Sequence, residues 1–323
     1  MLNYPIKFEP ILKPKIWGGS KLRNLLKKDS DKENLGESWE ISGIENDLSI
    51  VENGVLKGRS INDLIETFGR EFLGKSIFEK FGMKFPLLIK FIDANSALSV
   101  QLHPHEKLAR ERHNSFGKTE MWYIMQADEG AEINIGFKET ITKEEYLDHL
   151  EKGKITDLLN FENIRKGNSF FINTGKVHAI GAGVLLAEIQ QTSDITYRIY
   201  DWDRKDAEGN FRELHTDLAV DAIDFEKKDD FRLQYEKEKN TVSNIAKSEY
   251  FTTNYLPVNG EVFRVFKEID SFVIYMCVSG RAKISTQGNF EYIDQGQTIL
   301  IPAINKEVKI TSKGVELLEV YID

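Results

Sequence analysis

The chain has 323 residues, enough for about two domains, and its 41% hydrophobic and 29% charged residues are typical of a folded protein. Its 43 Lys and Arg against 52 Asp and Glu give a net charge of −9, which argues against a nucleic-acid or anionic-membrane partner. The most apolar stretches, such as residues 272–278, are far shorter than the roughly 20 residues that cross a bilayer, and residues 1–7 lack an apolar signal core. We therefore expect a cytoplasmic protein. The single cysteine, Cys277, excludes an internal disulfide and a cysteine-based zinc cluster.

The first part of the chain mixes helical and strand patterns. Residues 60–73 place apolar side chains at helical spacing behind Ser60, and residues 142–150 open with a capping box of Thr142 and Glu145. These segments predict surface helices inserted between strands, and a further helix is expected over residues 106–112. Short apolar or β-branched runs bounded by turns then predict strands over residues 87–92, 98–102, 120–125, 132–135, 169–172, 184–189 and 195–200.

A charged stretch over residues 225–240 separates this region from a tail of closely spaced strand patterns. The expected tail strands are residues 251–256, 262–266, 272–278, 282–285, 290–293, 298–301, 308–310 and 315–321. Many short strands with glycine-rich turns, expected at Gly280, Gly288 and Gly296, indicate a mainly β protein of the sandwich or jelly-roll type. We expect two β-barrel-like domains, residues 1–235 with inserted helices and residues 236–323.

A first group of polar residues lies on the strand expected over residues 98–102. Alternate side chains of a strand share a face, so Ser99, Gln101 and His103 point one way and the apolar residues between them point the other way. If this face lies inside a barrel, its polar groups need partners, and a metal ion is one such partner. A solvated edge strand explains the same pattern equally well.

Two later strands carry further candidates. Lys118, Glu120 and Trp122 share one strand face, and His178 follows a glycine turn at the start of a strand. Glu188 lies on the next expected strand, and Arg198 on the one after it. Such residues are often structural or solvated when taken singly.

Together, four of these residues form a plausible ligand set: Gln101, His103, Glu120 and His178. Two nitrogen and two oxygen donors suit Zn²⁺ or a neighbouring divalent ion. Because only one donor is anionic, a bound Zn²⁺ would keep positive charge, which favours a Lewis-acid role over a purely structural one.

At this point the chain resembles the type I mannose-6-phosphate isomerases (phosphomannose isomerases) in their short bacterial form, members of the cupin superfamily. The matching segments are residues 14–19 (PKIWGG), 36–40 (GESWE), 86–104 (PLLIKFIDANSALSVQLHP), 118–123 (KTEMWY) and 175–204. The joint match in this order is far more specific than any single segment.

The resemblance implies a cupin, or jelly-roll, catalytic barrel with one Zn²⁺ per chain that interconverts mannose 6-phosphate and fructose 6-phosphate. By the same resemblance the zinc ligands are the four residues above, Arg198 is an active-site residue, and Lys118 and Glu188 line the pocket. It places Ser99 and Lys90 at the phosphate end of the substrate. The tail resembles a second, smaller cupin, and because its sequence lacks histidine we expect no metal site there.

Aldose–ketose isomerisation moves a proton between C1 and C2 through an enediol(ate). The site therefore needs a base that takes and returns the proton, and positive charge near the developing oxyanion. Zinc and Arg198 suit the electrostatic role, whereas Lys118, Glu188 and a zinc-bound water all remain open as the base. A buried lysine near Zn²⁺ and Arg198 would have its charged form disfavoured, which makes Lys118 a reasonable base.

Two other readings use the same scaffold. A metal-dependent cupin oxygenase would hold Fe²⁺, but such sites favour histidine-rich ligand sets over a glutamine with one carboxylate. A sugar-phosphate-binding cupin without turnover would not need all four ligands together with Arg198 and Lys118. The sequence says nothing of the oligomeric state.

Overall fold

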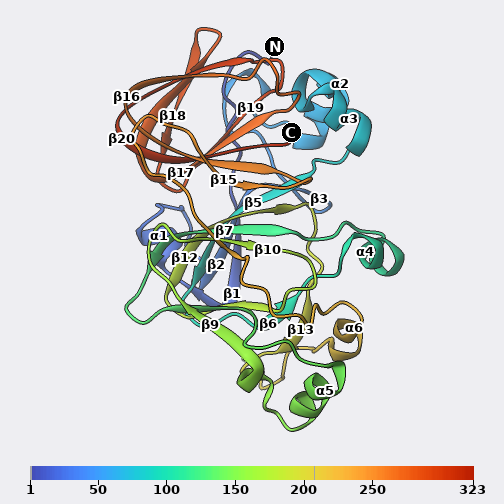
Figure 1. The fold of residues 1–323 in the computed structure, drawn as a ribbon. Helices are drawn as coiled ribbons and strands as arrows, with labels where there is room; N and C mark the ends of the chain where they lie inside the picture. The colour runs from blue at the N-terminus through green and yellow to red at the C-terminus, as the bar shows by residue number, and fades with distance from the viewer. Residues whose placement is uncertain (1, 207) are drawn as a thin grey trace.

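The computed structural model describes residues 2–206 and 208–323, which fold into two stacked β-units (Figure 1). Strand pairing is antiparallel throughout the three main sheets of these residues. The mainly β architecture expected from the sequence is confirmed. No helix of the described residues is both long and apolar enough to span a membrane.

The first unit contains two sheets. In spatial order the seven-stranded sheet consists of β1 (Ile11–Gly19), β2 (Leu35–Ile41), β5 (Leu87–Ala94), β12 (Val184–Gln191), β7 (Glu120–Ala127), β10 (Ser169–Ile172) and β14 (Arg232–Leu233). The five-stranded sheet consists of β13 (Tyr197–Tyr200), β6 (Val100–Leu102), β11 (His178–Ile180), β8 (Glu132–Phe137) and β9 (Leu159–Asn163). A small hairpin joins β3 (Gly43–Ile44) to β4 (Asp47–Leu48). Neither β1 nor β2 was expected from the sequence.

The second unit is a C-terminal sheet ordered β15 (Ser243–Lys247), β16 (Thr252–Val265), β20 (Glu307–Tyr321), β17 (Val273–Thr286) and β18 (Asn289–Asp294), with β19 (Thr298–Ile301) paired to β17. The expected tail strands are present, but three neighbouring pairs are continuous strands, namely β16, β17 and β20. The turn expected at Gly280 is instead an irregularity inside β17. Gly280 has a φ of +80°, and an added Cβ would lie 2.2 Å from the carbonyl oxygen of Gly314, so glycine allows the strands to continue past this point.

The expected helices form. Helix α2 (Ile61–Leu73) starts at Ser60, whose hydroxyl accepts a hydrogen bond from the Asp63 backbone N–H while the Asp63 carboxylate accepts from that of Ser60. The others are α1 (Lys21–Asn24), α3 (Lys75–Phe81), α4 (Glu106–His113), α5 (Lys143–Glu151) and α6 (Thr216–Val220), with 3₁₀ turns at Gly54–Leu56 and Ile155–Leu158.

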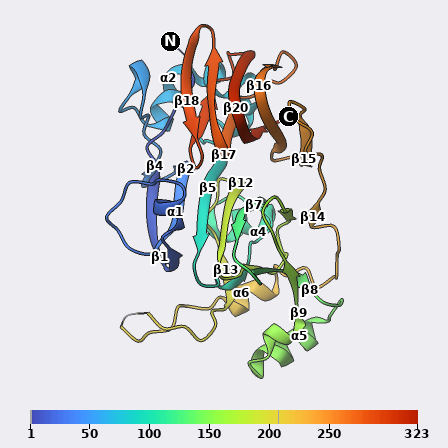
Figure 2. The same cartoon turned by 90° about the vertical axis from the view of Figure 1, so that its left-hand side faces the viewer.

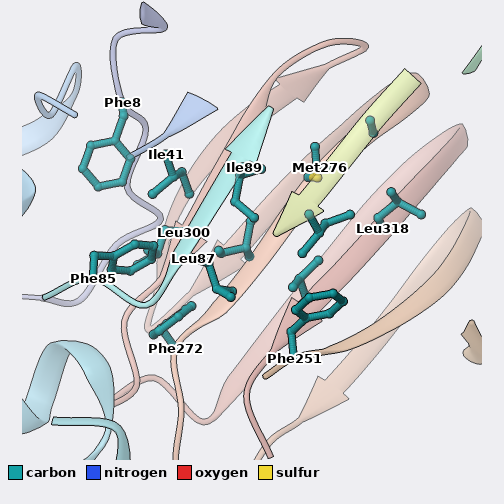
Figure 3. Packing of buried hydrophobic residues seen from close by; sticks show 14 of the residues in the cluster. Phe8, Ile41, Phe85, Leu87, Ile89, Phe251, Phe272, Met276, Leu300 and Leu318 are labelled. Carbon is teal, nitrogen blue, oxygen red and sulfur yellow. The ribbon is translucent and has the colours of Figure 1, made fainter. Parts of the chain in front are cut away.

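The seven-stranded sheet lies between the C-terminal sheet and the interior of its own unit (Figure 2). Alternate residues of β5, such as Leu87 and Ile89, join a core cluster with Phe272, Met276 and Leu318 of the C-terminal sheet (Figure 3). The intervening residues point to the opposite face. The strand register therefore decides which side chains reach the interior.

Residues near the N-terminus also contact the C-terminal sheet. Ile6 and Leu300 exchange backbone hydrogen bonds of 2.9 and 2.8 Å, and the Ala303 N–H donates to the carbonyl of Phe72 in α2. On β17, Cys277 is fully buried, and burial raises the pKa of its thiol to about 12. The two units thus share contacts from both ends of the chain.

Candidate active site

A cavity of about 320 Å³ lies between the seven-stranded and five-stranded sheets. Strands of both sheets line it, because the interior-facing residues of β5, β7 and β12 lie opposite those of β6, β11 and β13. It brings together eight of the nine candidate residues from the sequence: Lys90, Ser99, Gln101, Lys118, Glu120, His178, Glu188 and Arg198. The ninth, His103, touches two of these.

His103, Glu120 and His178 form a compact buried cluster. Nε2 of His103 lies 3.4 Å from one carboxylate oxygen of Glu120, and Nε2 of His178 lies 3.5 Å from the other. Their potential ligand atoms all lie within 4.8 Å of one another, and each residue is only 1% exposed. Among the described residues, this is the one His, Cys, Asp and Glu group with such spacing.

Backbone contacts orient both imidazoles. Nδ1 of His103 lies 2.9 Å from the carbonyl oxygen of Ile195, and Nδ1 of His178 lies 2.8 Å from that of Lys176. A carbonyl only accepts, so Nδ1 carries the hydrogen in both rings and Nε2 keeps its lone pair. Nε2 of His178 is buried without a hydrogen-bond partner, and Oε2 of Glu120 accepts no hydrogen bond although the Lys118 ammonium lies 3.3 Å away. Orphaned lone pairs of this kind fit a divalent cation.

The charge states of the cluster also suit a cation. Burial, helped by Lys118, lowers the pKa of His103 to about 3, and burial lowers that of His178. Burial alone would raise the pKa of Glu120, but Lys118 and His103 outweigh it and hold this pKa well below its usual range. The cluster therefore offers two neutral imidazoles and one carboxylate, as metal binding requires.

Gln101 and Lys118 border the cluster. Gln101 on β6 pairs directly with His178 on β11, and its side-chain oxygen accepts a hydrogen bond of 3.1 Å from the hydroxyl of Ser99. The Lys118 ammonium lies 3.2 Å from Nε2 of His103 and 3.3 Å from Oε2 of Glu120. Lys118 thus occupies the space beside the expected ligand atoms.

A cross-strand row forms the opposite wall. Trp39, Lys90, Glu188 and Trp122 are consecutive partners across β2, β5, β12 and β7. The Lys90 ammonium lies 3.1 Å from one oxygen of Glu188, and the indole N–H of Trp122 donates to the other at 3.0 Å. Burial raises the pKa of Glu188, although Lys90 opposes this shift.

Arg198 occupies the more exposed rim of the cavity. It pairs with Gln101 across β13 and β6, and one Nη donates to the carbonyl of Glu213 at 2.8 Å. Its Nε is buried without a partner. Burial, followed by the nearby Arg212, lowers the pKa of Arg198.

Several other lining residues were not predicted from the sequence as site residues. Glu37 and Trp39 lie in the segment that carried the family resemblance, and the indole N–H of Trp39 donates to Glu37 at 2.7 Å. If β2 had been expected, the alternate spacing of Glu37 and Trp39 would have placed both side chains on one face of a strand and indicated them as lining residues. Arg212 also lines the cavity, but it lies in an irregular segment without such a pattern.

Comparisons with known proteins identify the family. Residues 6–152 match the family described as "Phosphomannose isomerase type I, catalytic domain", and residues 241–322 match "Mannose-6-phosphate isomerase, cupin domain". The mannose-6-phosphate isomerase of Streptococcus mutans is 36% identical over 92% of this chain and 92% of its own. The chain belongs to the type I phosphomannose isomerase family.

Further relatives cover nearly the whole chain. The mannose-6-phosphate isomerase ManA of Bacillus subtilis is 34% identical over 94% of both chains. A crystal structure of the mannose 6-phosphate isomerase from Bacillus subtilis has a TM-score of 0.89 and 33% identity, and the match covers 99% of each chain. The family membership and the cupin-type fold expected from the sequence are confirmed.

Proposed function

We propose that this protein interconverts D-mannose 6-phosphate and D-fructose 6-phosphate in the cytoplasm by proton transfer through an enediol(ate). The observation that carries the proposal is the buried cluster of His103, Glu120 and His178, in which Nε2 of His178 and Oε2 of Glu120 lack hydrogen bonds. The cluster lies beside a cavity with acid, base and guanidinium groups. Family membership supplies the choice of substrate. No feature of the site favours an oxygenase.

We propose one Zn²⁺ per chain at this cluster, held by His103, Glu120, His178 and the neighbouring Gln101. The protonated Nδ1 atoms and the single carboxylate suit a site built from nitrogen and oxygen donors. For Gln101, ligation would mean sharing the oxygen that now accepts from Ser99. When bound, the ion would polarise the substrate oxygens next to the carbon that loses its proton.

The chain supplies two side chains able to move that proton, Lys118 and Glu188. Both line the cavity and are buried, which excludes water and strengthens their interaction with a substrate. The raised pKa of Glu188 brings this carboxylate closer to the range in which a base takes and returns a proton. Arg198 at the rim offers positive charge to an oxyanion.

Ser99 and Lys90 are our proposed candidates for the phosphate end of the substrate. Ser99 lines the cavity beside Gln101 and has a hydroxyl able to donate to a phosphoryl oxygen. Lys90 can serve there only by giving up its ion pair with Glu188.

A coupled assay that follows fructose 6-phosphate formed from mannose 6-phosphate tests this function. We expect turnover to disappear when purified protein is treated with a chelator and to return when Zn²⁺ is restored. Protein that contains one metal ion per chain and still shows no turnover would contradict the proposal. If mannose 6-phosphate then raised the melting temperature of the protein without being converted to product, the protein would be a binding protein.

A further inference from the structure

Asp201 joins three segments at the rim of the cavity. Its carboxylate, only 6% exposed, accepts a hydrogen bond of 2.6 Å from Arg204 and a pair of bonds from Arg212, of which the Nε–H bond is 2.7 Å long. Arg204 also donates to the carbonyl of Ala97 at 2.8 Å. One carboxylate therefore ties the segment after β13 both to Arg212 and to the turn before Ser99.

The backbone next to Asp201 supports this arrangement. Trp202 and Asp203 have φ values of +57° and +52°, a left-handed conformation that is costly for side chains other than glycine, asparagine and aspartate. The indole N–H of Trp202 donates to the carbonyl of Leu98 at 2.7 Å. Since Leu98 and Ser99 line the cavity, the turn holds the cavity rim in place as well as its own loop.

Arg212 is held beside Arg198 on the same side of the cavity. Both residues line it, and the effect of Arg212 on the pKa of Arg198 reflects two positive charges in proximity. Arg198 has a buried Nε without a partner. Arg204 and Arg212 both form ion pairs with Asp201, and Arg198 lies close enough for that carboxylate to affect its pKa. Three guanidinium groups therefore lie around one buried carboxylate, so this part of the rim is suited to an anion.

The wall built from the seven-stranded sheet is less suited to a phosphoryl group. There Lys90 is paired with Glu188, and Lys15 lies 3.5 Å from Glu37, so each cation has a carboxylate of its own. At the rim, Arg204 and Arg212 share the single carboxylate of Asp201. A phosphoryl group would also lie near the negative charges of these carboxylates. The electrostatics therefore favour the rim with Arg198 and Arg212 for the phosphoryl group, and they make Lys90 a weaker candidate for the phosphate end than Ser99, which follows the turn tied to this rim.

We propose that Asp201 is a positioning residue that presents Arg212, next to Arg198, to the phosphoryl group of the substrate. The identity of the anion as a sugar phosphate depends on the proposed function. Asp201 itself does not touch the substrate in this proposal. It fixes the direction of the guanidinium group, which favours bidentate contact with phosphate oxygens.

The test compares Asp201→Asn with wild type in the metal-loaded protein. We expect KM for mannose 6-phosphate and Kd for inorganic phosphate, measured by calorimetry, each to rise about tenfold, with kcat changed less than about twofold. The matched control is Asp203→Asn, whose carboxylate accepts from Tyr200 in the same loop and should leave both constants unchanged. Arg212→Gln should reproduce the rise in KM and Kd. The double variant should raise them little further, because both changes disrupt the same interaction between Arg212 and the phosphoryl group.

Unchanged phosphate affinity in Asp201→Asn would overturn the proposal, as would a fall in kcat with KM and Kd unchanged. If Asp201→Asn fails to fold, Arg212→Gln decides alone: wild-type phosphate affinity in that variant is the contrary result. Calorimetry with inorganic phosphate needs no turnover. If the wild-type protein fails to isomerise the sugar while the variants still lose phosphate binding, that result would contradict the proposed function and support the role of Asp201.

Discussion

Each histidine of the buried cluster has a single nitrogen available for a ligand, because a backbone carbonyl already holds the hydrogen of the other. This fixes the tautomer before any ion arrives and reduces the reorganisation that binding requires. At the residue scale, the cluster is thus preorganised by main-chain atoms of residues 176 and 195 rather than by further side chains.

Removal of the one carboxylate tests the cluster directly. We expect Glu120→Gln to lower zinc affinity by about tenfold or more, because the amide offers no negative charge to the ion. Metal content after dialysis against limiting chelator is the measurement. His149→Ala, a histidine change on surface helix α5, serves as the control and should keep the metal. Full metal content in Glu120→Gln would exclude this site.

Lys118 and Glu188 are distinguished by turnover in metal-loaded protein. The two variants are Lys118→Ala and Glu188→Gln. The variant that lacks the proton-transferring group should have a kcat about a hundredfold or more below that of wild type. The other group should give a smaller effect on kcat. Near-normal turnover in Lys118→Ala would remove Lys118 as the base and leave Glu188 or a metal-bound water.

The sequence alone predicted site residues best where they alternate with apolar residues along an expected strand. Gln101 and His103 are two residues apart at the end of one expected strand, and Glu120 lies on another, so the alternation of side chains along a strand predicted their common orientation. Glu37 and Arg212 were missed for different reasons. The first lies on an unexpected strand, and the second reaches the rim through an irregular segment that Asp201 holds in place.

At the scale of elements, glycine decides how closely segments approach. Helix α2 ends at Gly74, where φ is +100° and an added Cβ would lie 2.2 Å from the carbonyl oxygen of Asp270, in the loop that follows β16. Asp270 in turn accepts hydrogen bonds from the N–H groups of Lys75 and Ser76 at the start of α3. This junction fastens the α2–α3 pair to the second unit.

A matched pair of alanine variants measures that contact. Gly74→Ala should destabilise the protein by at least about 1 kcal/mol more than Gly82→Ala. Both glycines have positive φ, but an added Cβ at Gly82 would meet nothing within 4 Å. Urea unfolding of the two variants gives the difference, and equal losses of stability would show that the approach to Asp270 is unimportant.

The Asp201 ion pairs predict a pH dependence of stability. Burial would raise the pKa of Asp201, but Arg212 and Arg204 outweigh it and hold this pKa below its ordinary value of 3.8. A depressed folded-state pKa contributes stability above pH 3.8, and this contribution is lost as pH falls through the folded-state value. Asp201→Asn should therefore melt below wild type at pH 7, with a gap that narrows below pH 3.8. A gap independent of pH would contradict the ion-pair explanation.

The strands of the tail show why element boundaries are hard to read from sequence. Gly280 interrupts the apolar run in β17 and was taken for a turn, yet it permits an irregularity at close approach to Gly314 while pairing continues. The same residue type serves a turn or a bulge, and only the neighbouring strand decides between them. The existence of the strands was predictable, but their continuity was not.

At the scale of the whole molecule, the seven-stranded sheet serves both units. One face contributes to the core shared with the C-terminal sheet, and the other carries the cavity residues. The division into residues 1–235 and 236–323 stays a prediction. Contacts of Ile6 and of helix α2 with the C-terminal unit join the two sides of this expected boundary. Long-range contacts of this kind leave no local signal in a sequence.

This shared core predicts cooperative unfolding. We expect one calorimetric transition whose van't Hoff and calorimetric enthalpies agree, because Ile89 and Met276 belong to the same buried cluster. Metal removal should move this whole transition to lower temperature. Two resolved transitions, only one of them sensitive to a chelator, would show that the units unfold independently.

The buried Cys277 has a practical consequence. Its thiol is the only one in the chain, lies inside β17 and has a pKa raised to about 12, so little thiolate is available to an alkylating reagent. A cysteine engineered on the surface would then be the one readily labelled position in the native protein. Fluorophores or spin labels can thus be attached at chosen sites without first removing the natural thiol.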